Sequence, residues 1–400
     1  MIRRHSRSAI PLFACLATAL VAACGGKASD PTPISTLPTL GNPIDPWAPI
    51  SSLALPAGSE LKPWDATKVN IASPAGMAAL TTAQIYVALN NFDTSYAPNG
   101  PGLLVGFNPY RASMVIIDLA IATPVVPAER SCTSSGVVKA DSGKLYVACS
   151  GSYTAPAGPG RALVEVDPRT NAATRILALP SSLSFLPYSL AIASTKIWLG
   201  NTAGPSLASV DRNALTLVDG ASVSQPQIPV NCTDQKFGYI SDAAVYGGEL
   251  FVLCGSNSNG EIVRLDAATG VFKDKQLVGA QPVKMTQLPD GRIAIVNSVA
   301  NTVSFVTIAP AALTVAKDAI VLGAGADLEG VAFFNRYLFT VSSATQTVQK
   351  IDLAASGGPK IVAEVNTGNG SGPLSVVPLD ADHAVVSASL TGKIVGVTFP

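Results

Sequence analysis

The chain has 400 residues, of which 48% are apolar and 13% charged, and it contains 34 glycines and 30 prolines. This composition can form a large core and suits many short strands joined by turns, in one large domain or two ordinary ones. The 26 basic and 26 acidic residues balance, which argues against the basic surface that nucleic-acid binding requires.

The N-terminus has the pattern of a bacterial secretion signal. Arg3, Arg4 and Arg7 form a basic start, residues 9–19 are apolar, and the sequence Leu-Val-Ala-Ala-Cys ends at Cys24. That ending resembles a lipobox, which implies cleavage before Cys24 and diacylation of its sulfur. The alternative, an uncleaved membrane anchor, needs about 20 apolar residues. We therefore predict a signal peptide over residues 1–23 and attachment to the membrane through lipid on Cys24.

The location of the mature chain follows from this signal. We expect a bacterial cell-envelope protein, and because Gly25 rather than Asp follows Cys24, we expect the outer membrane in a Gram-negative host. Residues 24–50 are rich in Pro, Ser, Thr and Gly without a sustained hydrophobic period, which predicts a flexible tether. Residues 51–400 then form the folded domain.

The folded domain repeats one hairpin unit seven times. The template is the apolar run Leu250–Cys254, a Gly/Asn/Ser turn, and the alternating run Glu261–Asp266. Equivalent first runs follow one another at intervals of 60, 52, 53, 43, 44 and 47 residues, beginning at Ile85, Leu145, Ile197, Leu250, Ile293, Tyr337 and Ala384. Periods in this range indicate a propeller or a solenoid.

Two more strand-like runs lie between successive hairpins, so each unit supplies the four strands of a propeller blade. Each hairpin's second run ends at a short polar residue that favours a turn: Asn108, Asp167, Asp211, Asp266, Thr307, Asp352 and Thr398. The seventh unit lacks its outer strand. We predict that residues 67–71 pair with the strand around Val395 and close the ring, which removes two open sheet edges. The predicted fold is an all-β, seven-bladed propeller of four-stranded antiparallel blades.

The repeats resemble the YVTN type of β-propeller repeat. Tyr86-Val87 and Tyr146-Val147 keep the opening pair of that motif, and Asn201 and Asn297 keep its closing Asn. The resemblance covers about residues 65–400 and implies the propeller fold. It does not imply one activity, because propellers of this kind include surface proteins, binding scaffolds and lactonase-like enzymes.

Four cysteines belong to the propeller. Cys149 and Cys254 end equivalent strands, and Cys132 and Cys232 precede equivalent inner strands. Because the start of one antiparallel strand lies beside the end of the next, we predict the disulfides Cys132–Cys149 and Cys232–Cys254, worth about 3 kcal/mol each. The alternative is a metal or redox site, but the chain has no Cys-x-x-Cys motif.

Motifs for catalysis are scarce. The chain contains no P-loop, no dinucleotide-binding glycine motif, no EF-hand and no HExxH sequence. His383, the one histidine of the propeller, is expected in a turn on the rim opposite the disulfides, away from the usual binding side. We therefore expect no catalytic residue and no cofactor.

The remaining candidates lie on the rim where the inner strands begin, which we call the mouth. Two long turns, residues 90–100 and 150–160, carry Phe92, Asp93, Tyr96 and Tyr153. These turns are either a contact surface for a partner or turns without a binding role. Further candidates near the starts of inner strands are Tyr188, Asp234, Lys236, Lys284, Asp327 and Glu329. The last two carboxylates are weak candidates for an oxygen-rich cation site, or else solvated channel residues.

Two functions stay open. The first is a monomeric scaffold that binds a protein, peptide or glycan partner and no nucleic acid. The second is a divalent-cation-dependent hydrolase of the lactonase or gluconolactonase type that uses the central channel. Scarce histidine and the lack of an obvious carboxylate cluster favour the scaffold.

Overall fold

A computed structural model describes residues 52–55, 65, 67–111, 113–120, 131–153, 160–180, 183–218, 228–229, 232, 238–258, 260–323 and 325–400. Contacts divide the chain into Met1–Leu37 and Pro38–Pro400, and every described residue lies in the second unit. The predicted signal peptide, the tether and Cys24 fall outside the described residues.

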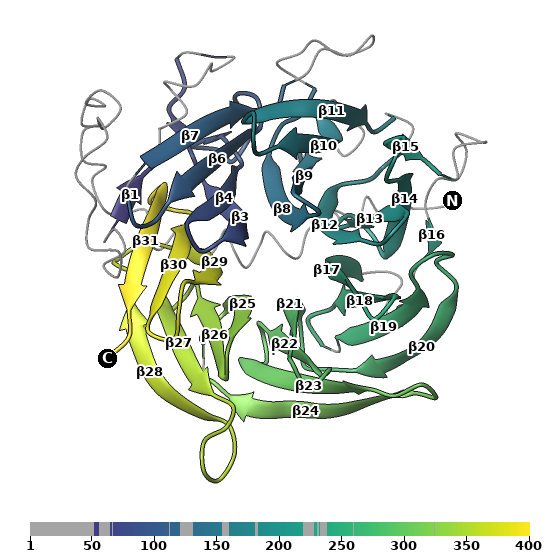
Figure 1. Cartoon of the computed structure of the whole chain (residues 1–400), viewed down its shortest axis with the longest axis vertical. Helices are drawn as coiled ribbons and strands as arrows, with labels where there is room; N and C mark the ends of the chain where they lie inside the picture. Colours follow the sequence, from purple (N-terminus) through teal and green to yellow (C-terminus); the bar gives the residue numbers. More distant parts are fainter. Residues whose placement is uncertain are drawn as a thin grey trace, which may run out of the picture. The chain divides into compact units, whose positions relative to one another are not determined.

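Within the described residues all regular structure is β-strand, and no helix there could cross a membrane. Seven antiparallel sheets are arranged as blades around a centre, which confirms the predicted fold, and two short strands form a separate sheet described below (Figure 1). Each inner strand contacts the next around a closed ring, in the order β3, β8, β12, β17, β21, β25, β29 and back to β3.

Within each blade the strands follow one another from the centre of the ring outward. Blade 1 contains β3 (Pro74–Thr81), β4 (Gln84–Leu89), β6 (Leu103–Asn108) and β7 (Ser113–Asp118). Blade 2 contains β8 (Ser135–Asp141), β9 (Lys144–Ser150), β10 (Arg161–Asp167) and β11 (Ala172–Ala178). Blade 3 contains β12 (Pro187–Ile192), β13 (Lys196–Asn201), β14 (Ser206–Asp211) and β15 (Thr216–Leu217), and β16 (Ile228–Pro229) also pairs with β14.

The other blades continue around the ring. Blade 4 contains β17 (Tyr239–Tyr246), β18 (Glu249–Gly255), β19 (Glu261–Asp266) and β20 (Phe272–Leu277). Blade 5 contains β21 (Pro282–Gln287), β22 (Ile293–Asn297), β23 (Thr302–Ile308) and β24 (Leu313–Val321). Blade 6 contains β25 (Leu328–Phe334), β26 (Tyr337–Ser342), β27 (Thr347–Asp352) and β28 (Lys360–Asn366). Blade 7 contains β29 (Pro373–Pro378), β30 (His383–Ala388), β31 (Lys393–Thr398) and β1 (Ser52–Ala54).

The ring is closed by an N-terminal strand, but the segment predicted for this role is wrong. β1 pairs antiparallel with β31, with Ser52 opposite Val395. Residues 67–71 instead contribute β2 (Asn70–Ile71), which pairs with β5 (Phe92–Asp93) in the mouth turn of blade 1. The physical reason is that Lys68 forms an ion pair with the buried Asp93 carboxylate at 2.9 Å, which holds this segment on blade 1.

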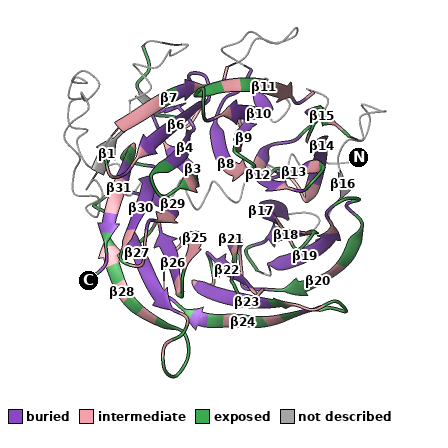
Figure 2. Ribbon diagram, in the orientation of Figure 1, coloured by how far each residue is buried: buried purple, intermediate pink, exposed green. Residues whose placement is uncertain are grey.

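The core consists of seven apolar clusters, one between each pair of neighbouring blades. Alternate residues of a strand point to opposite faces of its sheet. In β4, for example, Tyr86 and Ala88 pack toward blade 2, whereas Ile85, Val87 and Leu89 pack toward blade 7. Both faces of the middle strands are therefore buried, which explains their continuous apolar runs, and the outer strands carry most of the exposed positions (Figure 2).

The turn residues behave as local chemistry predicts at five of the seven positions. Asn108, Asp167, Asp211, Asp266 and Asp352 each accept a hydrogen bond from the backbone N–H two residues later, at 2.8–3.1 Å. Thr307 lies within β23, and Thr398 ends β31. Both predicted disulfides are confirmed, with Cα–Cα distances of 5.4 Å for Cys132–Cys149 and 5.9 Å for Cys232–Cys254.

Candidate functional site

Every inner strand carries a β-bulge near the mouth. The register with the second strand shifts just after Pro74, Ser135, Pro187, Ile240, Pro282, Leu328 and Pro373. A bulge re-aims the extra side chain, and Pro is tolerated beside it. Tyr188 of blade 3 and Glu329 of blade 6 occupy equivalent bulge positions, on strands β12 and β25 across the ring from each other (Figure 1).

Four aromatic rings form a continuous run over blades 1 to 3. The ring centroid of Phe92 lies 6.4 Å from those of both Tyr96 and Tyr153, and Tyr153 lies 6.4 Å from Tyr188. Phe92 is buried, and the three tyrosines are half-buried. Tilted and edge-on pairs at such distances contribute about 0.5–1.5 kcal/mol each. The structure thus joins aromatic residues that lie up to 96 positions apart (Phe92 to Tyr188) into one surface, which we call the aromatic run.

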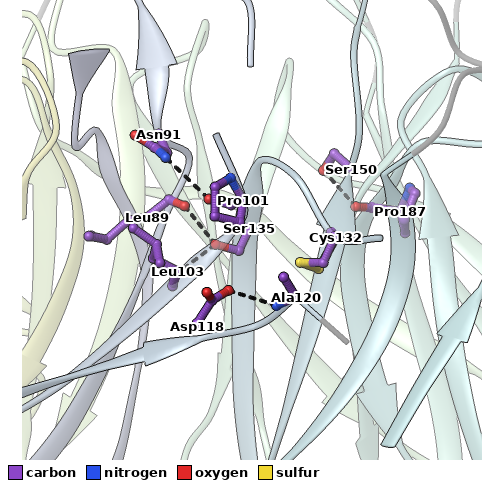
Figure 3. The surroundings of a disulfide bond; sticks show 11 residues. Leu89, Asn91, Pro101, Leu103, Asp118, Ala120, Cys132, Ser135, Ser150 and Pro187 are labelled. Atoms are coloured by element: carbon purple, nitrogen blue, oxygen red, sulfur yellow. Dashed lines mark hydrogen bonds between the residues drawn. A yellow bond between two sulfur atoms is a disulfide. The ribbon is translucent and has the colours of Figure 1, made fainter. Parts of the chain in front are cut away.

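Hydrogen bonds join blades 1, 2 and 3 near the mouth, and a disulfide lies within blade 2 (Figure 3). The Ser135 hydroxyl of blade 2 lies 2.6 Å from the Leu89 carbonyl oxygen and 2.8 Å from that of Leu103, both in blade 1. The Ser150 hydroxyl donates to the Pro187 carbonyl of blade 3 at 2.8 Å. The Cys132–Cys149 disulfide fixes the start of the turn that carries Tyr153. These hydrogen bonds and the disulfide therefore hold in place the backbone that carries the aromatic rings.

Asp93 has a structural role within this turn. Its Oδ1 accepts hydrogen bonds from the Ser95 and Ala97 N–H groups at 2.8 and 3.0 Å, and its Oδ2 accepts one from Lys68. Burial acts to raise the pKa of Asp93, but the hydrogen bonds outweigh it and hold the pKa at about 2. Because both oxygens are engaged and the side chain is buried, Asp93 shapes the turn and does not face a ligand.

A carboxylate pair lies on the opposite side of the mouth. Asp327 accepts hydrogen bonds from the hydroxyls of Ser298 and Ser343, and Ser343 also lies 3.5 Å from Glu329. Burial, with the neighbouring Asp327 charge, raises the pKa of Glu329 to about 8. Burial raises the pKa of Tyr188 to about 12, and the Glu329 charge adds to this shift. Tyr188 and Glu329 thus connect the aromatic run and the carboxylate pair to equivalent bulges of the inner strands.

Lys284 is already partnered. Its ammonium lies 3.5 Å from Oδ1 of Asp242, which is 1% exposed, and Oδ2 of Asp242 accepts a hydrogen bond from the Met285 N–H. This pair links the inner strands of blades 4 and 5. The Lys284 charge lowers the pKa of Glu329, but less than burial and Asp327 raise it.

Asn90 is a mouth residue that the sequence did not single out. Its side chain is 6% exposed, and among the described residues its Oδ1 has no hydrogen-bond partner. A Cβ atom placed on Gly136 would lie 3.6 Å from this oxygen and 3.1 Å from the Tyr188 ring. Oδ1 of Asn90 and the edge of the Tyr188 ring therefore both lie next to Gly136, an inner-strand residue without a side chain.

The sequence candidates have three different outcomes. The structure brings Phe92, Tyr96, Tyr153 and Tyr188 together, and it places Lys284, Asp327 and Glu329 on inner strands or their starts at the same mouth. Asp234 and Lys236 lie outside the described residues. His383 begins β30, beside the Asp380 carboxyl at 2.9 Å, at the end of blade 7 opposite the mouth.

Sequence reasoning missed the bulge ring and four residues around it: Asn90, Asp242, Ser298 and Ser343. One signal was available, because a proline precedes the bulge in blades 1, 3, 5 and 7. In the described part of the chain, no three His, Cys, Asp or Glu side chains gather as a metal site would require. The described mouth residues can stack on a ligand and accept hydrogen bonds from it.

Comparison with known proteins identifies the fold alone. No protein-family model and no curated protein matches the chain. Among solved structures, hydrazine synthase of Kuenenia stuttgartiensis is similar with a TM-score of 0.60 and 13% identity over 83% of this chain and 97% of that one. Virginiamycin B lyase from Staphylococcus aureus gives a TM-score of 0.58 and 13% identity over 83% and 98%. A putative 6-phosphogluconolactonase from Bacteroides fragilis gives 0.54 and 13% over 77% and 88%.

Proposed function

We propose that this chain is a lipid-anchored envelope protein whose propeller binds a protein, peptide or glycan partner at the mouth. The aromatic run is the observation that carries the proposal. Half-buried tyrosines whose backbone is held in place offer a large contact area at little cost in side-chain entropy. Aromatic residues are enriched in binding surfaces for this reason. The lipobox-like sequence ending at Cys24 supports the anchor.

The position of histidine favours binding over hydrolysis at the mouth. The chain has two histidines, His5 in the predicted signal peptide and His383 at the other end of blade 7. Histidine is the commonest general base, so a reaction at the mouth would need another base, such as a carboxylate, or a bound ion. A binding function needs neither.

Removing two of the three half-buried tyrosines of the aromatic run tests the proposal. We expect the Tyr153→Ala, Tyr188→Ala double variant to bind glycan and peptide arrays at least tenfold more weakly than the wild type. The full chain is used in detergent, and Phe272→Ala, which removes an exposed aromatic ring from the outer strand β20, is the matched control. Equal binding by the double variant and the wild type would overturn the assignment of the site to the mouth.

The second candidate, a divalent-cation-dependent hydrolase, is based on the paired carboxylates Asp327 and Glu329. In the described part of the chain, no third His, Cys, Asp or Glu side chain joins Asp327 and Glu329, so we expect calcium or zinc to leave the melting temperature unchanged. A bound cation would stabilise the fold by RT ln(1 + [L]/Kd), which thermal melts over a titration detect. An increase that Asp327→Asn abolishes would favour the hydrolase.

A further inference from the structure

We infer that the partner presents a cationic side chain, arginine in preference to lysine, to the mouth between the aromatic run and the Asp327–Glu329 pair. This inference depends on the proposed function and specifies the chemistry of its ligand. It makes the occupant an exposed basic peptide segment and not a neutral glycan.

The first support is the hydrogen-bonding character of the mouth. The Asp327 and Glu329 carboxyls supply acceptor oxygens on one side. On the other side, Oδ1 of Asn90 is a buried acceptor that no described residue satisfies, next to the Tyr188 ring. A buried, unsatisfied acceptor is costly, and Oδ1 of Asn90 has almost no accessible surface, so a ligand that moves the Tyr188 ring aside and donates to this oxygen gains that free energy. The ligand should therefore be rich in N–H donors.

The second support is charge. Among the described residues, Lys284 is the cation whose charge acts on Glu329, and its ammonium is partnered by Asp242. Asp327 accepts hydrogen bonds from two serine hydroxyls, and it forms no ion pair with any residue that the structure describes. A positive group from the partner would complete this side of the mouth.

The third support is the aromatic run. The face of a tyrosine ring attracts cations, and the attraction is stronger where water is partly excluded, as around the half-buried Tyr153 and Tyr188. A guanidinium group is planar, stacks on rings and carries five N–H donors, whereas an ammonium has three. Arginine can therefore donate to several acceptors and cover a ring face with one group.

A neutral sugar fits this mouth less well. Sugars need donors as well as acceptors from the protein, but the hydroxyls of Ser298 and Ser343 already donate to Asp327. A glycan is thus the alternative that the experiment must separate.

Isothermal titration of the full chain in detergent tests the inference with three probes. These are a capped Gly-Arg-Gly-Arg-Gly peptide, the same peptide with citrulline in place of arginine, and chitotriose. Citrulline keeps the shape of arginine and removes its charge. We expect the arginine peptide to bind, the citrulline peptide to bind at least tenfold more weakly, and the arginine affinity to fall as salt rises.

Variants locate the binding. The Asp327→Asn, Glu329→Gln double variant should lose at least tenfold in affinity for the arginine peptide. Asp290→Asn, which removes an exposed carboxylate that pairs with Arg292 in the turn between β21 and β22, is the control and should bind normally. Thermal melts confirm that each variant is folded.

Other results would overturn the inference. If chitotriose or the citrulline peptide binds as well as the arginine peptide, and the tyrosine double variant abolishes this binding, the mouth is a binding site but not for a cation. If the arginine peptide does not bind, or binds the carboxylate double variant equally well, the cationic ligand is wrong. The proposed function fails on a separate result, namely that the Tyr153→Ala, Tyr188→Ala variant binds the glycan and peptide arrays as well as the wild type does.

Discussion

Glu329 shows how a single bulged residue couples the mouth to stability. Burial and the Asp327 charge raise its pKa from 4.5 to about 8, against the opposing effects of Lys284 and Ser343. A carboxyl with a raised pKa binds its proton more tightly in the folded chain than in the unfolded chain. Its contribution to stability is fully present below pH 4.5 and is lost as pH rises through about 8.

Replacing this carboxyl should remove the pH dependence. We expect Glu329→Gln to raise the melting temperature by about 2–5 °C at pH 8.5 and to change it little at pH 4.5, where both side chains are neutral. Circular-dichroism melts at the two pH values measure the difference. Glu364→Gln in the outer strand β28 controls for the loss of a charge. An equal effect of Glu329→Gln at both pH values would contradict the assigned shift.

Residues whose environment is local were predictable from the sequence. The Asn and Asp residues at strand ends engage N–H groups two positions away, so their role follows from composition and spacing. Asn90 and Asp242 are different. Asn90 matters because of Gly136 and Tyr188 in the next two blades, and Asp242 because of Lys284 in the next blade. No short sequence pattern encodes such neighbours.

At the scale of elements, ring closure shows why short edge strands are hard to assign. β1 and β2 have three and two residues, and neither has the length to show a period. What separates them is long-range: Leu55, just after β1, is 6% exposed in the apolar cluster between blades 7 and 1, and its N–H donates to the Gly392 carbonyl at 3.0 Å.

Two proline substitutions distinguish β1 from residues 67–71 as the strand that closes the ring. Leu55→Pro removes this donor and a buried side chain, so we expect a loss of about 3 kcal/mol or more in the free energy of unfolding. Val69→Pro alters an exposed residue of the segment first predicted to close the ring and should cost far less. Urea unfolding of the full chain measures both. A larger loss from Val69→Pro would restore residues 67–71 as the closing strand.

For the whole molecule, repetition made the fold predictable and left the site obscure. Seven copies of one hairpin unit reveal the pattern although the sequence of each copy varies. The seven apolar clusters between neighbouring blades follow from the packing of these repeated units. The mouth is built from departures from the repeat: two long turns, and Tyr188 and Glu329 at two of seven equivalent bulges. A residue that occurs in one copy alone cannot be recognised by comparison with the other copies. Only the three-dimensional structure shows which of these residues lie close together.

The predicted lipid anchor determines where this mouth works. A single acyl chain binds membranes only marginally, and each buried CH₂ contributes about 0.8 kcal/mol, so two or three chains on Cys24 would hold the protein stably. We expect Cys24→Ser to move the protein from the membrane fraction to the soluble fraction on cell fractionation. Cys15→Ser, within the predicted signal peptide, is the matched control and should stay with the membrane. Intact mass measurement of the wild type should show cleavage before Cys24 and added acyl chains. A Cys24→Ser protein that stays with the membrane, or a wild-type mass that retains residues 1–23, would contradict the anchor.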